Sequence, residues 1–188
     1  MFVGAAVRPR FHSLFIVTVA TGLRSCEVRA LREEDYDPPH LRVRQKARRV
    51  RGAWMCDNYL KTKTGERTVT LPPFAQAALG EVMTGKGGLL FRSPSGEPLH
   101  AQVIQEELDR VAKEAGTPRL PFHGLRHTVA TVLANASVAP QIIQRRLGHS
   151  RIGVTMDLYA HKTPGQDAPA ADVLEQFFGN DKQTGGNR

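Results

Sequence analysis

The sequence has little cysteine and no long hydrophobic run, and each absence argues against a class of protein. Cys26 and Cys56 are its two cysteines, too few for a disulfide framework or a four-cysteine zinc site. The most apolar stretch, residues 11–20, contains polar residues and falls short of the roughly 18 residues that a membrane span needs. No basic region precedes the short apolar run at residues 2–7, so no signal peptide is expected. These features predict a cytoplasmic protein, in a reducing compartment and without membrane contact.

Negative charge is also scarce. The 188 residues include 26 Lys and Arg against 18 Asp and Glu, a formal net charge of +8. The hydrophobic share of 40% and the charged share of 23% are close to those of globular domains, which argues against wholesale disorder and for one domain with an appendage at most. Excess positive charge favours a polyanionic partner, most simply nucleic acid. A solvated basic surface is the alternative, and net charge does not choose between them.

Hydrophobic periodicity, together with glycine and proline positions, predicts an α+β fold that is mainly α-helical. Helices are expected at residues 11–20, 25–31, 73–83, 100–115, 124–136, 140–147, 152–161 and 168–178. Ser25 is the predicted N-cap of the second helix, and Gly22 and Gly148 are predicted to end helices. Alternating patterns at residues 41–47, 53–61 and 66–71 predict a small three-stranded antiparallel sheet inserted after the second helix.

The first predicted strand is strongly basic. The run from residue 41 to residue 51 contains no acid and six cations, namely Arg42, Arg44, Lys46, Arg48, Arg49 and Arg51. On one continuous strand the first four would point to the same face, where like charges are costly unless solvent or a polyanion neutralises them. Phosphates along a nucleic-acid strand would do so, which makes Arg42, Arg44 and Lys46 candidate DNA-binding residues. A solvated sheet edge is the alternative.

Two further segments hold candidate site residues. His123 and Arg126 are three residues apart and share a side of a helical turn. His123 and His127 have metal-ligand spacing, but the sequence offers no further ligands nearby, so a partly buried, hydrogen-bonded His127 is the simpler interpretation. Arg24 lies at a predicted helix N-terminus, where its planar guanidinium suits phosphate oxygens, and Glu27 can brace it. An ordinary surface ion pair is the alternative.

Other candidates are weak when taken singly. Lys63 lies near the tip of a predicted hairpin, where lysines usually serve only solubility. His149 follows a predicted C-terminal helix cap, and Tyr159 comes ten residues after it, flanked by apolar residues that also suit a core position.

Taken together, these residues resemble the catalytic signature of the tyrosine recombinase (phage integrase) family. The matching stretches are TGLRSCEV, KTKTGERTVTLP, HGLRHT and LGHSRIGVTMDLYAH, in this order, and the resemblance covers about residues 10–165. It implies a catalytic set of Arg24, Lys63, His123, Arg126, His149 and Tyr159, with Glu27 supporting Arg24.

The resemblance implies DNA cleavage through a covalent 3′-phosphotyrosine, with neither metal nor ATP. Tyr159 would attack the scissile phosphate, and the two arginines would stabilise the charge on its non-bridging oxygens. His123 would accept the tyrosine proton, His149 would donate a hydrogen bond to the phosphate, and Lys63 would protonate the 5′-oxygen leaving group. Rejoining to another 5′-hydroxyl exchanges strands, in DNA integration or excision.

The resemblance also implies an organisation and partners. Residues 1–165 would form the catalytic domain, and residues 166–188 a C-terminal helix and tail that docks between protomers or caps its own core. The expected partners are double-stranded DNA and further copies, with a tetrameric synapse in the full-length protein of a bacterium or phage, at nucleoid DNA. Because the chain begins almost at the first catalytic helix, the expectation is an excised fragment or a natural truncation without the core-binding domain.

Three alternatives remain open at this point. A topoisomerase-like enzyme would nick and close DNA with the same residues. A DNA-binding regulator would lack turnover and would not need Tyr159. A metal-dependent nuclease would need a carboxylate cluster, which the sequence lacks.

Overall fold

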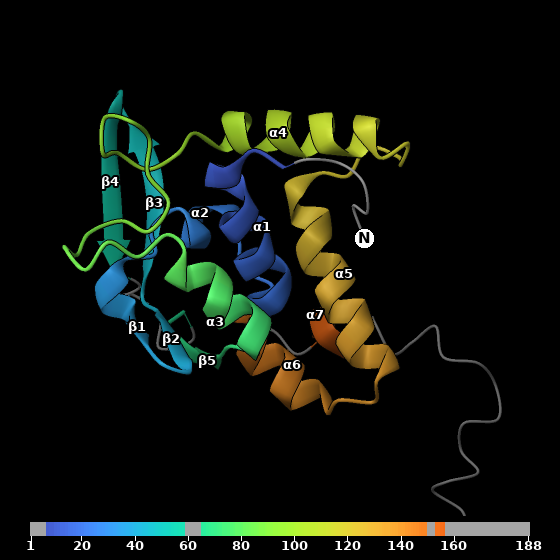
Figure 1. Cartoon of the computed structure of the whole chain (residues 1–188). Helices are drawn as coiled ribbons and strands as arrows, with labels where there is room; N and C mark the ends of the chain where they lie inside the picture. The colour runs from blue at the N-terminus through green and yellow to red at the C-terminus, as the bar shows by residue number, and fades with distance from the viewer. Residues whose placement is uncertain (1–6, 59–64, 150–152, 157–188) are drawn as a thin grey trace, which may run out of the picture.

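The computed structural model describes residues 7–58, 65–149 and 153–156 as a helical body with two small antiparallel sheets at one side (Figure 1). Its elements are α1 Pro9–Thr21, α2 Ser25–Val28, the 3-10 turn η1 Glu33–Asp35, β1 Tyr36–Asp37, β2 His40–Val43, β3 Gln45–Val50, β4 Ala53–Asn58, β5 Arg67–Thr70, α3 Pro73–Gly80, α4 Ala101–Glu114, α5 Phe122–Asn135, α6 Pro140–Leu147 and α7 Gly153–Met156. The mainly helical α+β fold predicted from the sequence is confirmed. No helix among these residues is long and apolar enough to cross a membrane.

Helix α1 is the centre of the core and packs against α3 and α5 (Figure 1). Phe11, Leu14 and Val17 recur every three residues and are fully buried. Buried Thr18 and Thr21 donate their hydroxyl groups to carbonyls one turn earlier, which satisfies these polar groups within the helix. The helix therefore tolerates burial on most sides.

The basic strand is interrupted, which corrects the sequence prediction. The run predicted as residues 41–47 divides at Arg44 into β2 and β3, which belong to different sheets. Strand β2 pairs with β1 and β5, and its buried Leu41 lies opposite Val69. Strand β3 pairs with β4 in a two-stranded hairpin. Arg51 and Gly52 join these two strands with positive φ angles of 48° and 86°, as a two-residue hairpin turn requires.

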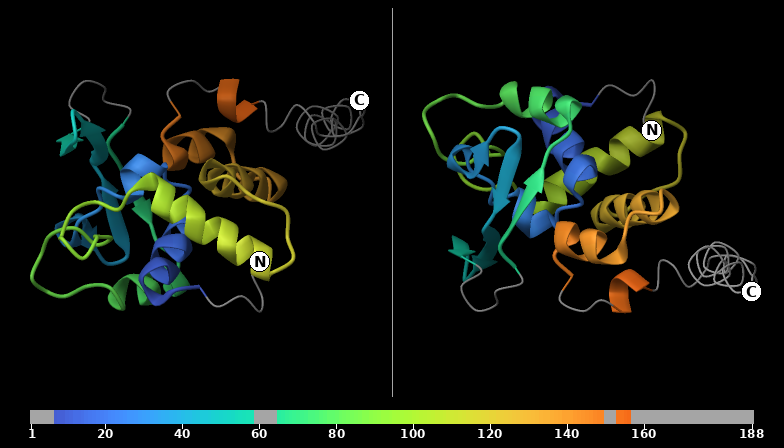
Figure 2. Two further views of the ribbon diagram at one scale, coloured as in Figure 1. Left: turned by 90° about the horizontal axis from the view of Figure 1, so that it is seen from above. Right: turned by 90° about the horizontal axis from the view of Figure 1, so that it is seen from below.

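The C-terminal half supplies three helices beside α1. Helices α4, α5 and α6 confirm the predictions for residues 100–115, 124–136 and 140–147. Pro140 opens α6, and Gly148 ends it with a φ of 69°. Helix α6 packs against both α5 and β5. Figure 2 shows the sheets and the α5–α6 pair flanking α1 from opposite sides.

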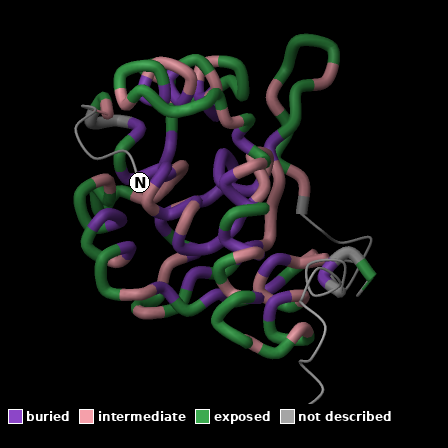
Figure 3. Tube along the Cα trace, turned by 90° about the vertical axis from the view of Figure 1, so that its right-hand side faces the viewer, coloured by how far each residue is buried: buried purple, intermediate pink, exposed green. Residues whose placement is uncertain are grey.

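Buried residues form two apolar clusters, a large one around α1 and a smaller one between α5 and α6. Figure 3 shows the buried segments in the interior of the body and the exposed segments around them. Of the predicted helix at residues 152–161, the structure describes α7, Gly153–Met156. The predicted helix at residues 168–178 lies outside the described residues.

Candidate active site

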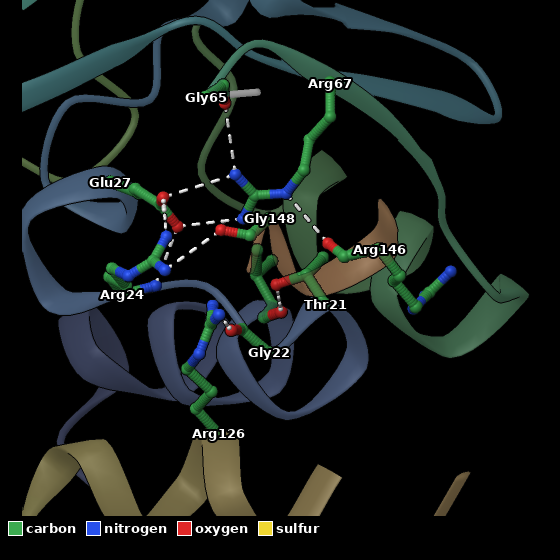
Figure 4. Close-up of polar contacts among 10 residues, drawn as sticks. Thr21, Gly22, Arg24, Glu27, Gly65, Arg67, Arg126, Arg146 and Gly148 are labelled. Carbon is green, nitrogen blue, oxygen red and sulfur yellow. Dashed lines mark hydrogen bonds and ion pairs between the residues drawn. The ribbon is translucent and has the colours of Figure 1, made fainter. Parts of the chain in front are cut away.

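A fully buried carboxylate, that of Glu27, lies at the centre of the site (Figure 4). Arg24 Nη1 donates to Glu27 Oε1 at 3.0 Å, and Arg67 Nη2 donates to Glu27 Oε2 at 2.9 Å. Arg67 Nη1 adds a third bond, to Oε1, at 3.2 Å. An unpaired buried charge is very costly, so the two guanidinium groups are needed to compensate the Glu27 carboxylate in the folded chain.

Arg24 connects two distant segments. It is the N-cap of α2, and its backbone N–H donates to Glu27 Oε2 at 2.9 Å. The prediction of Ser25 as N-cap was therefore wrong by one residue, because the Glu27 carboxylate reaches back to Arg24 and fixes the start of the helix there. Arg24 Nη2 donates to the Gly148 carbonyl at 3.0 Å. The side chain remains 36% exposed, so it can also meet a ligand.

Arg126 approaches from α5. It is only 3% exposed, and its Nη1 donates to the carbonyl of Gly22 at 2.8 Å. Gly22 ends α1 and lies two residues before Arg24, so the same turn positions both arginines (Figure 4).

His149 follows the end of α6. Its Nδ1 lies 2.9 Å from the hydroxyl of Thr155, which is fully buried in α7. Desolvation, followed by the positive charges of nearby arginines, lowers the pKa of His149 to about 4. The imidazole is therefore neutral at pH 7, with one N–H donor and one acceptor nitrogen.

His123 is the second residue of α5, with an exposed side chain. Desolvation and the charges of Arg126 and Arg24 lower its pKa, which favours the unprotonated ring at neutral pH. His123 also contributes to the lowered pKa of His149, so the two imidazoles share one electrostatic environment. His127, expected to be partly buried, is exposed. Within the described ranges, no group of three His, Cys, Asp or Glu side chains is placed to hold a metal ion.

The structure thus brings together four of the predicted residues, Arg24, His123, Arg126 and His149, with Glu27 behind them. Lys63 and Tyr159 lie outside the described residues.

The basic row predicted on one strand face does not form as expected. Arg42 is exposed on β2, whereas Lys46 lies on β3 in the other sheet. Arg44, between the two strands, pairs with Asp35, and Arg48 pairs with Asp57 of β4. Acidic partners contributed by other segments therefore neutralise Arg44 and Arg48.

Sequence reasoning overlooked Arg67. Its residue is 7% exposed, and it shares a strand face with the buried Val69. The period-two pattern gave a signal, because a cation on the buried face of a strand requires a polar partner. The spacing of residues within the strand could not identify Glu27 as that partner.

Known proteins are similar to this chain in sequence and in fold. The model of the phage integrase family matches residues 6–166. The chain is 28% identical to a tyrosine recombinase XerC-like protein of Caldanaerobacter subterraneus subsp. tengcongensis, covering 90% of this chain and 50% of that protein. It is also 28% identical to an integrase of Streptomyces ambofaciens, covering 93% of this chain and 50% of the relative. The chain therefore spans about half the length of these curated relatives.

Solved structures show the same likeness. The Tn1549 transposon integrase in complex with transposon right end DNA matches with a TM-score of 0.77 and 26% identity, over 94% of this chain and 61% of that chain. The XerH site-specific recombinase bound to its difH substrate matches with a TM-score of 0.67 and 25% identity, over 92% of this chain and 49% of that chain. The fold is that of a tyrosine recombinase catalytic domain. The chain belongs to the phage integrase family.

Proposed function

We propose that this chain is the catalytic part of a site-specific recombinase that cleaves and rejoins DNA strands through Tyr159. The observation that carries the proposal is the convergence of Arg24, Arg126 and His149 from α2, α5 and the end of α6. Its relatives include proteins named integrase and tyrosine recombinase, and two similar structures hold DNA. Residues 1–165 would form this catalytic domain.

The two arginines would hold the scissile phosphate. The pentacoordinate transition state concentrates negative charge on the non-bridging oxygens, and preorganised donors stabilise that charge more than the ground state. Arg126 is held by the Gly22 carbonyl and Arg24 by Glu27 and Gly148, so neither must reorganise when the charge develops. A guanidinium stays charged throughout and offers paired donors to a phosphate.

His149 would donate one hydrogen bond to the same phosphate. Its ring is neutral at pH 7, so a single nitrogen carries the proton. If the Thr155 hydroxyl donates to Nδ1, the proton resides on Nε2, where it can face the substrate. Thr155 would thereby select the tautomer that the reaction needs.

Proton movements would complete the cleavage step. The Tyr159 oxygen forms a bond to phosphorus as the bond from phosphorus to the 5′-oxygen breaks, which leaves a 3′-phosphotyrosine. The phenolic proton passes to His123, whose lowered pKa keeps it unprotonated and ready to accept. Lys63 protonates the departing 5′-oxygen. Rejoining reverses these transfers.

Double-stranded DNA is the proposed partner. The net charge of +8 favours a polyanion, and Arg42 on β2 and Lys46 on β3 would contact its phosphates, with Arg44 between the two strands. Because the relatives are bacterial or phage proteins, the place of action would be nucleoid DNA in the cytoplasm.

Self-association on DNA is proposed from an apolar groove. A cavity of about 670 Å³ runs between α3, α5 and α6, and its lining includes the exposed Phe74, Val132 and Ile142. Large exposed apolar areas mark interaction sites. We assign as occupant the segment 166–188 of a second copy, which carries Phe177 and Phe178, and several copies linked in this way would form the tetrameric synapse.

A nicked synthetic half-site tests the proposal, because loss of the short end traps the covalent intermediate. The unchanged chain should form a protein–DNA adduct on a denaturing gel, with EDTA present. Tyr159→Phe should form none while binding the DNA equally well. Tyr36→Phe removes a hydroxyl that lies 3.5 Å from Gln76 and should form the adduct normally.

The outcomes separate the alternatives. Adduct formation and religation without exchange between duplexes would indicate a nicking-closing enzyme. DNA binding without any adduct would indicate a regulator, and an adduct in Tyr159→Phe would place the nucleophile elsewhere.

A further inference from the structure

Arg67 joins three elements of the site from a buried position. Its side chain is 4% exposed, and it extends from β5 to the ends of α2 and α6 (Figure 4). Besides its two bonds to Glu27, its Nε donates to the Arg146 carbonyl at 2.8 Å, and its Nη1 donates to the Gly65 carbonyl at 3.3 Å. The planar fork thus has carboxylate and carbonyl acceptors around it, an arrangement that an ammonium group cannot reproduce.

The Arg67 guanidinium also lies directly against the turn before His149. A Cβ atom at Gly148 would approach Arg67 Nη1 to 2.8 Å and Cζ to 3.0 Å. Gly148 has a φ of 69°, and its carbonyl accepts the bond from Arg24. The turn that presents His149 is therefore held between the two arginines, and only glycine allows this close approach.

The charges give Arg67 a second effect. Glu27 carries one negative charge and lies between two guanidinium groups, so the three side chains together are cationic. Without Arg67, the negative charge of Glu27 would cancel the positive charge of Arg24. Because Arg67 shares Glu27 from the buried side, a net positive charge remains, and Arg24 can attract an anion at its exposed side.

We propose that Arg67 is a positioning residue for the reaction: from beneath the site it holds Glu27 and the Gly148 turn, and so aims Arg24 and His149 at the phosphate. The presence of a phosphate at this site rests on the proposed function. The positioning of Arg24 and His149 by Arg67 rests on the geometry of the chain alone. Arg67 does not touch DNA in this role, because its side chain is buried.

The electrostatic environment of His149 supplies a readout. The groups that act on it are Arg126 and His123 from α5, Arg24 from α2 and Arg67 from β5. For His123, the charged groups that lower its pKa are Arg126, Arg24 and His127. Removal of the Arg67 charge should therefore affect the two histidines differently.

The experiment titrates both imidazoles by NMR in the whole chain without DNA. Arg67→Gln should raise the pKa of His149 by roughly one unit and leave that of His123 in place. Arg119→Gln removes an exposed arginine paired with Asp109 and changes the net charge equally, so it should move neither pKa. Equal movement of both histidines would show a merely structural role, and no movement would show no coupling; either result overturns the proposal.

A kinetic measurement separates positioning from DNA binding. Arg67→Gln should slow single-turnover cleavage of bound half-site DNA at least about tenfold, and should raise the Kd for DNA by a smaller factor. Arg67→Lys keeps the positive charge but loses the planar, paired donors of the guanidinium. His149 should therefore titrate as in the unchanged chain, while cleavage should remain slow. This variant replaces Arg67→Gln in the test if Arg67→Gln does not fold. Native cleavage rates in Arg67→Lys would overturn the proposal. Absence of any adduct in the unchanged chain would instead refute the proposed function and leave the titration result standing.

Discussion

The Arg126 guanidinium donates to the Gly22 carbonyl at 2.8 Å, which joins α5 to the turn that carries Arg24. Both arginines therefore depend on one residue in a left-handed conformation, with a φ of 69°. A Cβ atom at Gly22 would lie 2.3 Å from Leu147 Cδ2, at the end of α6. The turn is thus enclosed by the same helices that supply the rest of the site.

Gly22→Ala should destabilise the chain by roughly 2–4 kcal/mol, because alanine is strained at positive φ and its methyl group overlaps Leu147. Urea unfolding followed by circular dichroism measures the change. Gly80→Ala is the control, since a Cβ there meets nothing within 4 Å and alanine favours the helix. Equal effects of the two substitutions would contradict the enclosed turn.

Arg24→Ala and Arg126→Ala should each slow cleavage by roughly 10²–10³-fold, the scale for one preorganised donor. Lysine at either position should restore only part of the rate, because an ammonium lacks the paired donors. Single-turnover cleavage of the nicked half-site measures both effects. Arg119→Ala, at an exposed arginine, should react normally. Full activity in Arg126→Lys would count against paired donors on the phosphate.

The free energy of unfolding should fall as the pH drops from about 6.5 to about 4. The pKa of His149 is lowered from 6.5 to about 4 in the folded chain, so in this window the unfolded chain binds more protons. The stabilising effect is complete above pH 6.5. His149→Gln should therefore show a shallower dependence in urea titrations across this window. His40→Gln, at an exposed imidazole of β2, should keep the steeper slope. Identical slopes in all three proteins would refute the assignment.

Neutralising Arg42 and Lys46 together should weaken binding to all DNA sequences alike. Each lost phosphate contact should lower the slope of log K against log salt by about 0.9. Arg48→Gln is the matched control, because the Arg48 guanidinium already pairs with Asp57. Fluorescence anisotropy at several salt concentrations distinguishes the variants. An unchanged slope in the double variant would make this segment a solvated surface.

Val132→Asp should weaken self-association on DNA at least about tenfold, because it places a charge in the apolar groove at a side chain that is 60% exposed. Sedimentation of the complex with half-site DNA measures the assembly. Removal of residues 166–188 should have the same effect, and the two changes together should add nothing further. Met55→Asp, on β4 outside the groove, should assemble normally. Additive effects would mean that the tail docks elsewhere.

Much of the helical framework could be predicted from local pattern. Apolar spacing places α4 and α5 within two residues of their predicted bounds, and Gly22 and Gly148 end helices where expected. The motifs that contain Arg24, His123, Arg126 and His149 likewise predicted the family, which the family model confirms. These features could be predicted because the spacing of apolar residues and the backbone conformation are properties of neighbouring residues.

The pairing of the strands could not be predicted from the local sequence. Residues 41–47 form one basic alternating run, yet the chain changes partners at Arg44, because β2 pairs with β5 and β3 pairs with β4. Pairing depends on which strand lies alongside, and this is a contact between distant segments. The N-cap of α2 was misplaced for a related reason, since the side chain of Glu27 reaches back to Arg24.

Folding also determined which charges are paired. Arg67 and Glu27 are 40 residues apart in sequence, and their ion pair forms where β5 meets the end of α2. Arg67 and the exposed Arg42 both occupy alternating positions in short strands, but Arg67 lies on the buried face with Val69 and Arg42 on the exposed face. Burial separates them: removed from water, a guanidinium requires carboxylate and carbonyl partners within hydrogen-bond distance, and only the packing of distant segments brings those partners together.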